Sequence, residues 1–129
     1  MILVDTTVVV EYLRTASEPI CAVLDSGAAA ICGVTRAEIL HGARTPADVA
    51  SLVEALDGFV QVPIDEDAWD ALGWNLSVLR SRGAVTPFPD ALIATVAIRA
   101  GLELWTYDAH FSVIQSALPA LRLFAGPQP

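Results

Sequence analysis

The chain opens with an apolar run, residues 1–4 (Met-Ile-Leu-Val), that leads directly into Asp5, Thr6 and Thr7. A short apolar run without polar alternation is typical of a strand buried on both faces, as in a parallel sheet. Asp5 would then lie at the carboxyl end of that strand, which is the edge where open α/β sheets bind ligands. The acid is therefore either a helix cap or part of a functional site.

Short apolar runs alternate with helical patterns from one end of the chain to the other. Further strands are predicted at residues 28–34, 59–63, 103–106 and 121–124, and helices at 6–14, 18–27, 35–44, 46–58, 65–83, 89–101 and 108–114. This alternation predicts an α/β sandwich with a mainly parallel sheet. Because 129 residues leave no room for a second core, we expect one domain over residues 1–125, followed by a frayed tail over 126–129.

Two local patterns make further structural predictions. Thr35 and Glu38 have the spacing of a capping box, with Val34 and Ile39 placed as a hydrophobic staple, so a helix is predicted to begin at Thr35. In the helix predicted over residues 65–83, helical spacing indicates a buried face formed by the side chains of Trp69, Leu72, Leu76 and Leu79.

The charge balance limits the ways in which the chain can bind nucleic acid. The net charge is −8, from 15 acidic residues and seven arginines, with no lysine. Proteins that hold nucleic acid by broad phosphate neutralisation are usually basic. Any contact would therefore be local, through a metal ion or a few arginines, of which Arg80 and Arg82 are the best candidates. The 54% hydrophobic content is high for a small monomer and indicates assembly with a partner, to which Trp74, Phe88 and, as an alternative to burial, Trp69 could contribute.

The cysteines and the N-terminus indicate the compartment. Cys21 and Cys32 lie among small and apolar residues without metal-ligand spacing, so we expect free, buried thiols. No basic segment precedes the first apolar run, and no apolar run approaches the about 20 residues that a membrane span needs. We therefore expect a cytoplasmic protein without membrane contact.

Four carboxylates are predicted to meet at one edge of the sheet. Asp5, Glu38 and Asp108 follow predicted strands, and Asp90 lies in the first turn of the helix that leads into the strand ending at Thr106. Each acid also has a structural interpretation, as a helix cap or as a partner of a helix dipole. Together they would repel one another unless a cation neutralises them. Hard oxygen ligands suit Mg²⁺ or Mn²⁺, and such an ion can activate a hydrolytic water.

Four blocks of sequence in this order resemble the PIN-domain nucleases, and most closely the small ribonuclease toxins of VapBC-type toxin–antitoxin pairs. The blocks are residues 3–8 (LVDTTV), 35–42 (TRAEILHG), 89–94 (PDALIA) and 104–111 (LWTYDAHF). The resemblance implies a PIN-like three-layer sandwich and metal-dependent hydrolysis of RNA phosphodiester bonds. It also implies a cognate antitoxin that covers the acidic pocket, and a homodimer or a toxin–antitoxin hetero-oligomer.

The resemblance assigns roles to individual residues. Asp5 and Asp90 match the acids that bind Mg²⁺ (or Mn²⁺) most directly, and Asp108 matches a further ligand. Glu38 would hold metal-bound water or a second ion. The hydroxyl groups that would orient these carboxylates belong to Thr6 and Thr106. His110 lies nearby in sequence without an evident partner, and we interpret it as a surface or core residue.

Other phosphate-handling folds agree less well with these residues. A phosphate-accepting receiver domain requires a lysine, which this chain lacks, and a haloacid-dehalogenase-type phosphatase requires Asp-x-Asp where the chain has Asp5-Thr6-Thr7. Neither a Gly-x-Gly-x-x-Gly turn nor a Gly-Lys-Ser/Thr loop is present. Two alternatives remain open: a catalytically silent PIN-like interaction module, and a nuclease that acts on structured DNA.

Overall fold

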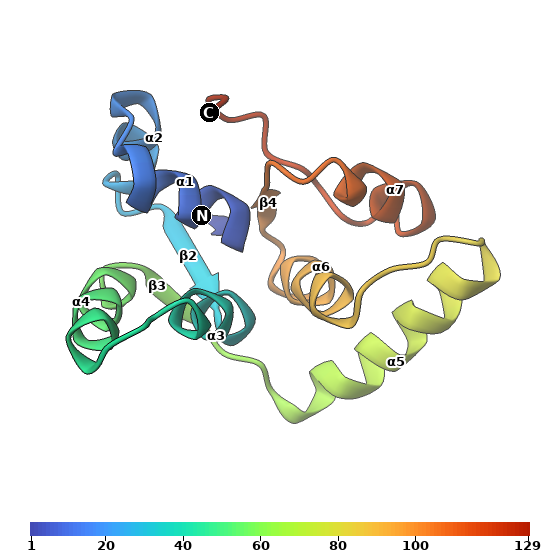
Figure 1. Cartoon of the computed structure of the whole chain (residues 1–129). Helices are drawn as coiled ribbons and strands as arrows, with labels where there is room; N and C mark the ends of the chain where they lie inside the picture. The colour runs from blue at the N-terminus through green and yellow to red at the C-terminus, as the bar shows by residue number, and fades with distance from the viewer.

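A computed structural model describes residues 1–129, the whole chain. Its centre is a four-stranded sheet in the order β3-β2-β1-β4 (Figure 1), in which every neighbouring pair is parallel. The strands are β1 (Ile2–Val4), β2 (Ala29–Cys32), β3 (Val60–Val62) and β4 (Glu103–Trp105). The helices are α1 (Thr6–Thr15), α2 (Glu18–Leu24), α3 (Gly33–His41), α4 (Pro46–Asp57), α5 (Glu66–Ser81), α6 (Phe88–Ala100) and α7 (His110–Ala117). None of these helices is long and apolar enough to cross a membrane.

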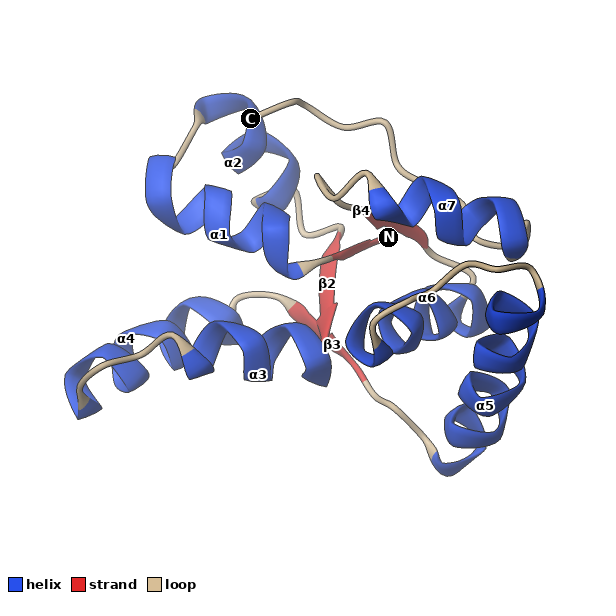
Figure 2. Ribbon diagram, turned by 45° about the vertical axis from the view of Figure 1, so that its right-hand side comes forward, coloured by secondary structure: helices blue, strands red, loops and turns tan.

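The two faces of the sheet are covered by different helices, which gives three layers (Figure 2). Successive strand residues point to opposite faces, so Leu3 joins the core under α5, α6 and α7, whereas Val4 joins the core under α1 to α4. Helix α6 lies against the sheet with residues 91–97 all buried. The predicted three-layer α/β sandwich with a mainly parallel sheet is confirmed.

The predicted capping box at the start of α3 is wrong. The helix begins at Gly33, directly after β2, so Thr35 and Glu38 both lie inside it. The fully buried hydroxyl of Thr35 faces the Val4 carbonyl oxygen at 3.5 Å, and Glu38 accepts a hydrogen bond from Thr6. Contacts with the neighbouring β1–α1 segment therefore replace the local cap.

The hydrophobic staple and the predicted burial of Trp69 are also wrong. Val34 and Ile39 both lie within α3 and pack on opposite core clusters, so they cannot clamp its start. In α5, the buried residues are Ala68, Leu72 and Leu79, and this narrow stripe leaves the Trp69 side chain 46% exposed.

The C-terminal segment also differs from the sequence prediction. Instead of a strand over residues 121–124, a single bridge joins Leu123 to Leu104. Beyond this bridge, Gly126 lies against the rings of Trp105 and Phe124. The tail, expected to be frayed, has no regular structure, yet the Tyr107 hydroxyl donates a 2.5 Å hydrogen bond to the Pro127 carbonyl.

The predicted state of the cysteines is confirmed in large part. Both are free; Cys32 is buried and Cys21 is half-buried.

Candidate active site

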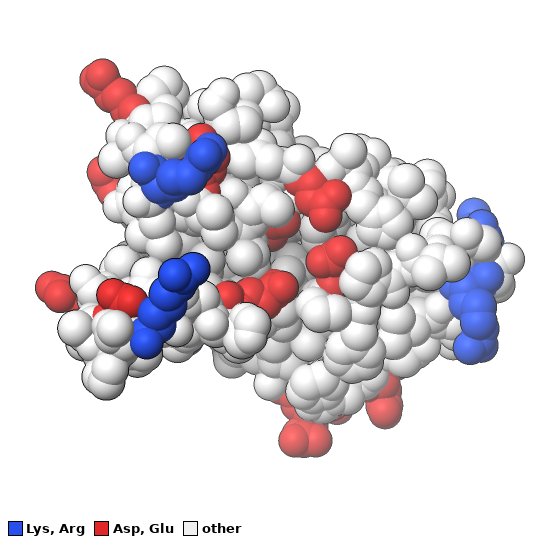
Figure 3. All heavy atoms as spheres, viewed as in Figure 1, with Lys and Arg blue, Asp and Glu red and all other residues white.

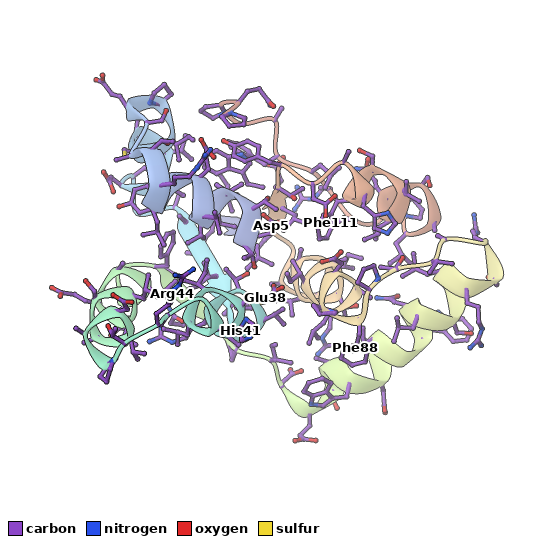
Figure 4. The ribbon with its side chains drawn as sticks, viewed as in Figure 1. Asp5, Glu38, His41, Arg44, Phe88 and Phe111 are labelled. Atoms are coloured by element: carbon purple, nitrogen blue, oxygen red, sulfur yellow. The ribbon has the colours of Figure 1, made fainter.

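The topology brings the four predicted acids to the carboxyl edge of the sheet. Asp5 directly follows β1, Asp108 lies three residues after β4, Glu38 lies in the helix after β2, and Asp90 lies in the first turn of α6. Figure 3 shows acidic atoms gathered in the centre of this face, and Figure 4 shows Asp5, directly before α1, and Glu38, in α3, pointing into that region. Parallel strands end at the same edge, which is why residues this far apart in sequence meet.

Asp5 is the buried anchor of this region, with only 3% of its surface exposed. It is the N-cap of α1, where its Oδ1 accepts from the backbone N–H groups of Thr7 (3.0 Å) and Val8 (3.3 Å). The same oxygen accepts from the Thr7 hydroxyl at 2.6 Å, and Oδ2 accepts from the Thr106 hydroxyl at 2.6 Å. Burial raises the pKa of Asp5 above its ordinary value, against the opposing effect of these hydrogen bonds.

Two threonines hold carboxylates of the cluster through their hydroxyl groups. Thr106 donates to Asp5 and accepts from the backbone N–H of Asp108 at 2.9 Å, so it ties the β1 and β4 loops together. Thr6 donates to Glu38 Oε1 at 2.8 Å. These are the two hydroxyl residues that the sequence pointed to, and the structure places each against a carboxylate of the cluster.

Thr7 is a third hydroxyl residue at the site, and it was not among the residues predicted from the sequence. Its hydroxyl donates to Asp5 and accepts from the Tyr107 backbone N–H at 2.9 Å, so it bridges the same two loops as Thr106. The sequence pattern could have indicated this role, because a hydroxyl residue two positions after an N-cap aspartate lies close to the carboxylate. The sequence supplied two adjacent threonines after Asp5, of which one faces Glu38 and the other faces Asp5 itself.

The four acids share one electrostatic environment. The pKa of Asp90 is raised, first by burial and then by the charges of Asp108, Glu38 and Asp5, while His110 opposes the shift. Asp108 Oδ1 accepts from the His110 backbone N–H at 2.9 Å, and the His110 Nε2 atom is buried without a hydrogen-bond partner. An Asp90 carboxylate destabilised by three others is a group that lacks its counter-charge.

The donor chemistry of the cluster fits a hard divalent cation. The donors are carboxylate oxygens without sulfur, and their repulsion is the kind that a cation relieves. As the side chains lie, no three Asp, Glu, His or Cys groups are arranged to hold a metal ion. Threonine hydroxyls hold Asp5 and Glu38, and a backbone N–H holds one oxygen of Asp108, and each of these carboxylates keeps lone pairs that could bind an ion.

The arginines lie away from the four clustered acids. Figure 3 shows the basic atoms toward the rim of the face, and acidic atoms both at its centre and at its rim. Three arginines are held in ion pairs, and Arg122 donates to the Gly101 carbonyl. The arginines outside these interactions are Arg44, Arg80 and Arg82, so Arg80 and Arg82, the predicted phosphate contacts, are free of partners within the chain.

The fold and the cluster define a small α/β protein with an acidic site at the carboxyl edge of a parallel sheet. The family model of the PIN domain matches residues 2–116. The chain belongs to the PIN-domain family.

Comparison with characterised proteins places the chain near the VapC group. It is 34% identical over 122 residues to ribonuclease VapC11 of Mycobacterium tuberculosis, a match that covers 88% of this chain and 91% of that protein. The DNA-bound VapBC structure from Salmonella typhimurium superposes with a TM-score of 0.83 at 21% identity, over 96% of this chain and 98% of that one. VapBC-5 of M. tuberculosis, a member of the VapBC family of toxin–antitoxin systems, gives a TM-score of 0.68 at 22% identity, over 95% and 96% of the two chains. The two structures show the shared fold.

Proposed function

We propose that this chain is a metal-dependent endoribonuclease, the toxin of a type II toxin–antitoxin pair, which hydrolyses RNA phosphodiester bonds at the carboxylate cluster. The observation that carries the proposal is the placement of four carboxylates at the carboxyl edge of the sheet, in a PIN-family chain similar to VapC ribonucleases. In agreement with this placement, burial and then the charges of Asp108, Glu38 and Asp5 raise the pKa of Asp90. The nuclease domain spans residues 1–125, with the catalytic groups Asp5, Glu38, Asp90 and Asp108.

Each residue of the cluster has its own role in the proposed reaction. Asp5, Asp90 and Asp108 hold Mg²⁺ or Mn²⁺, and Glu38 holds the attacking water or a second ion. When bound, the ion supplies charge neutralisation at the phosphate and lowers the pKa of a water molecule. Thr7 and Thr106 fix the orientation of the Asp5 carboxylate, and Thr6 does so for Glu38, because each donates a short hydrogen bond to it.

The same acidic region provides for regulation by a protein partner. A net charge of −8, with acids at the centre of one face, attracts a basic segment. We expect a cognate antitoxin to place a basic side chain among these acids, and to form a hetero-oligomer with the chain. A toxin that cleaves cellular RNA acts in the cytoplasm.

The decisive experiment is cleavage of a mixed RNA pool by the purified, antitoxin-free protein. We expect fragments with Mg²⁺ or Mn²⁺, none with chelator, and a loss of at least about 100-fold in Asp90→Asn, because a coordinating charge is removed. Asp25→Asn, a substitution at an exposed acid on α2's C-cap, is the matched control and should cleave like the wild type.

Three outcomes would contradict the proposal. Cleavage that survives Asp90→Asn would show that the site lies elsewhere or that the preparation is contaminated. Preferential cutting of structured DNA would identify a different nuclease. An absence of cleavage, together with no effect of metal on the melting temperature, would identify a silent interaction module.

A further inference from the structure

A cavity of about 200 Å³ adjoins the carboxylate cluster next to β4. Thr106 and Asp108, which belong to the loop after β4, line this cavity and also form part of the cluster. The remaining lining residues come from the start of α7 and from the C-terminal segment, which runs beside β4 (Figure 1). The protein has three other cavities, and none of them includes an acid of the cluster. The cavity next to β4 can therefore receive a group that is attached to a molecule bound at the acids.

The C-terminal segment is held in place beside the cavity, although it has no regular secondary structure. Two backbone hydrogen bonds of 2.8 Å join the segment to Leu104 in β4. Further along, the Tyr107 hydroxyl donates to the Pro127 carbonyl at 2.5 Å. The Phe124 ring packs edge-on against Trp105, with 5.5 Å between the ring centroids. These contacts give the wall of the cavity a defined position.

The lining of the cavity is suited to a neutral ring with hydrogen-bonding edges. Leu123 and Phe124 supply apolar surface. The Ser112 hydroxyl has no hydrogen-bond partner within the chain, and the Gln128 amide forms only one long hydrogen bond, of 3.4 Å, with a backbone carbonyl of its own segment. Both side chains therefore keep donors and acceptors for a ligand.

The charge and the size of the cavity narrow the choice of ligand. Asp108 is its only charged lining residue, and a carboxylate repels a phosphate. A cavity of roughly 150 Å³ is enough to bind benzene. The present cavity, at about 200 Å³, is therefore large enough for one pyrimidine ring with its exocyclic groups, whereas a purine would leave part of its second ring in solvent. Unpaired RNA bases are commonly recognised by stacking and by hydrogen bonds to their edges.

We propose that this cavity is the subsite for one unpaired pyrimidine base of the RNA, next to the phosphate that is cut, and that Gln128 recognises the edge of this base. The inference rests on the proposed nuclease function. Base and phosphate are attached to the same sugar, so a phosphate at the acids brings a base within reach of a cavity that begins at Asp108. The Gln128 amide has both donors and an acceptor, so it can pair with cytosine or with uracil.

The first test measures base preference. An RNA library with a randomised segment is cleaved in Mg²⁺ or Mn²⁺, and the fragment ends are sequenced. At one position beside the cut, the wild type should favour pyrimidines over purines at least about tenfold. Gln128→Glu should shift this position toward cytosine over uracil by about tenfold, because a carboxylate only accepts and cytosine presents an amino group where uracil presents an oxygen. A merely structural role of Gln128 would not shift the preference.

The second test blocks the cavity. Ser112→Leu should reduce cleavage at least about tenfold, because the longer side chain occupies the space of the base. It should leave the stabilisation by metal unchanged, since the acids are not altered. Leucine favours helix more than serine does, so the variant should fold. Ser51→Leu, at an exposed position of α4, is the matched control and should cleave like the wild type.

The third test measures binding without cleavage, by nuclear magnetic resonance. Free cytidine and uridine should shift the amide resonances of residues 106–112 and 123–128, with dissociation constants on the order of millimolar, and adenosine should bind more weakly. If no RNA is cut but these shifts occur, the nuclease proposal fails and the base site stands. If RNA is cut with metal but neither the shifts nor a pyrimidine preference occurs, the nuclease stands and this inference fails.

Each of three results would overturn the inference. The first is an absence of resonance shifts up to about 10 mM nucleoside. The second is a ratio of cytosine to uracil at the cut that is the same in Gln128→Glu and in the wild type. The third is a loss of antitoxin binding in the Gln128 and Ser112 variants with the base preference unchanged, which would assign the cavity to the antitoxin.

Discussion

Replacing Asp5 by asparagine separates the requirements of the fold from those of the site. The carboxylate is buried, and burial raises its pKa in the folded protein above the ordinary value of 3.8. In the pH interval between the unfolded and folded pKa values, the folded chain binds more protons than the unfolded chain. The free energy of unfolding therefore falls as the pH rises through that interval, and at neutral pH the ionised Asp5 destabilises the fold.

Asparagine removes the charge and keeps the cap. Its amide oxygen can still accept from the backbone N–H groups of Thr7 and Val8, and its amide nitrogen can donate to the Thr106 hydroxyl. In chelator at pH 7, we expect Asp5→Asn to melt at or above the wild-type temperature. Asp5→Ala loses the cap, about 1 kcal/mol, and leaves buried hydroxyls unpaired, about 1–3 kcal/mol, so its melting temperature should fall by roughly 10 °C.

In the presence of metal, we expect the wild type to have a higher melting temperature than Asp5→Asn, the reverse of the order in chelator. An ion at 100 times its dissociation constant adds about 2.7 kcal/mol to the stability of a protein that binds it, or roughly 10 °C for a chain of this size. The wild type should gain this stability from Mg²⁺ or Mn²⁺, and neither Asp5 variant should. Asp25→Asn serves as the control and should respond like the wild type.

The assay is thermal unfolding followed by circular dichroism, in chelator and over a metal titration. Two results would refute the reasoning. If Asp5→Asn melts as low as Asp5→Ala in chelator, the ionised carboxylate stabilises the fold. If Asp5→Asn gains the full metal increment, Asp5 does not bind the ion.

Three further predictions concern Thr106, the two cysteines and Gly126. Thr106→Val should destabilise the fold by about 1–3 kcal/mol in chemical denaturation and reduce RNA cleavage about 10- to 100-fold, because it leaves Asp5 Oδ2 and the Asp108 N–H unpaired. Burial raises the pKa of the Cys32 thiol, so a thiol reagent at pH 8 should modify Cys21 first, and Cys32 only in denaturant. Gly126→Ala should cost about 1–3 kcal/mol, measured by denaturation, because its Cβ would lie 2.6 Å from the Phe124 ring.

The sheet and its functional edge could be predicted because the signals are local. The apolar run before Asp5 and the alternation of strands with helices are sufficient to place Asp5, Glu38 and Asp108 at one end of a parallel sheet. That prediction needs only the direction of the strands. It does not need the packing of any particular side chain.

The failures occurred where a tertiary contact replaced a local one. Thr35 and Glu38 have the spacing of a capping box, yet both have partners on the β1–α1 segment, 31 and 32 positions away in sequence. Helical spacing allows two positions for the buried face of α5, one that includes Trp69 and one that is centred on Ala68. Only the packing of α5 on α6 determines which of the two is buried. Periodicity identifies an amphipathic helix without fixing the centre of its buried face to within one residue.

The threonines explain how a chain with such a cluster folds before it meets a cation. Four carboxylates at one edge oppose folding, and the pKa of Asp90 is raised first by burial and then by the charges of the other three. Hydroxyl donors from Thr7 and Thr106 offset part of the burial cost of Asp5, and Thr6 holds Glu38. A bound ion would neutralise part of the charge of Glu38, so the hydrogen bond from Thr6 would stabilise the fold less when metal is present. Removal of the Thr6 hydroxyl should therefore weaken the fold in chelator more than in saturating metal.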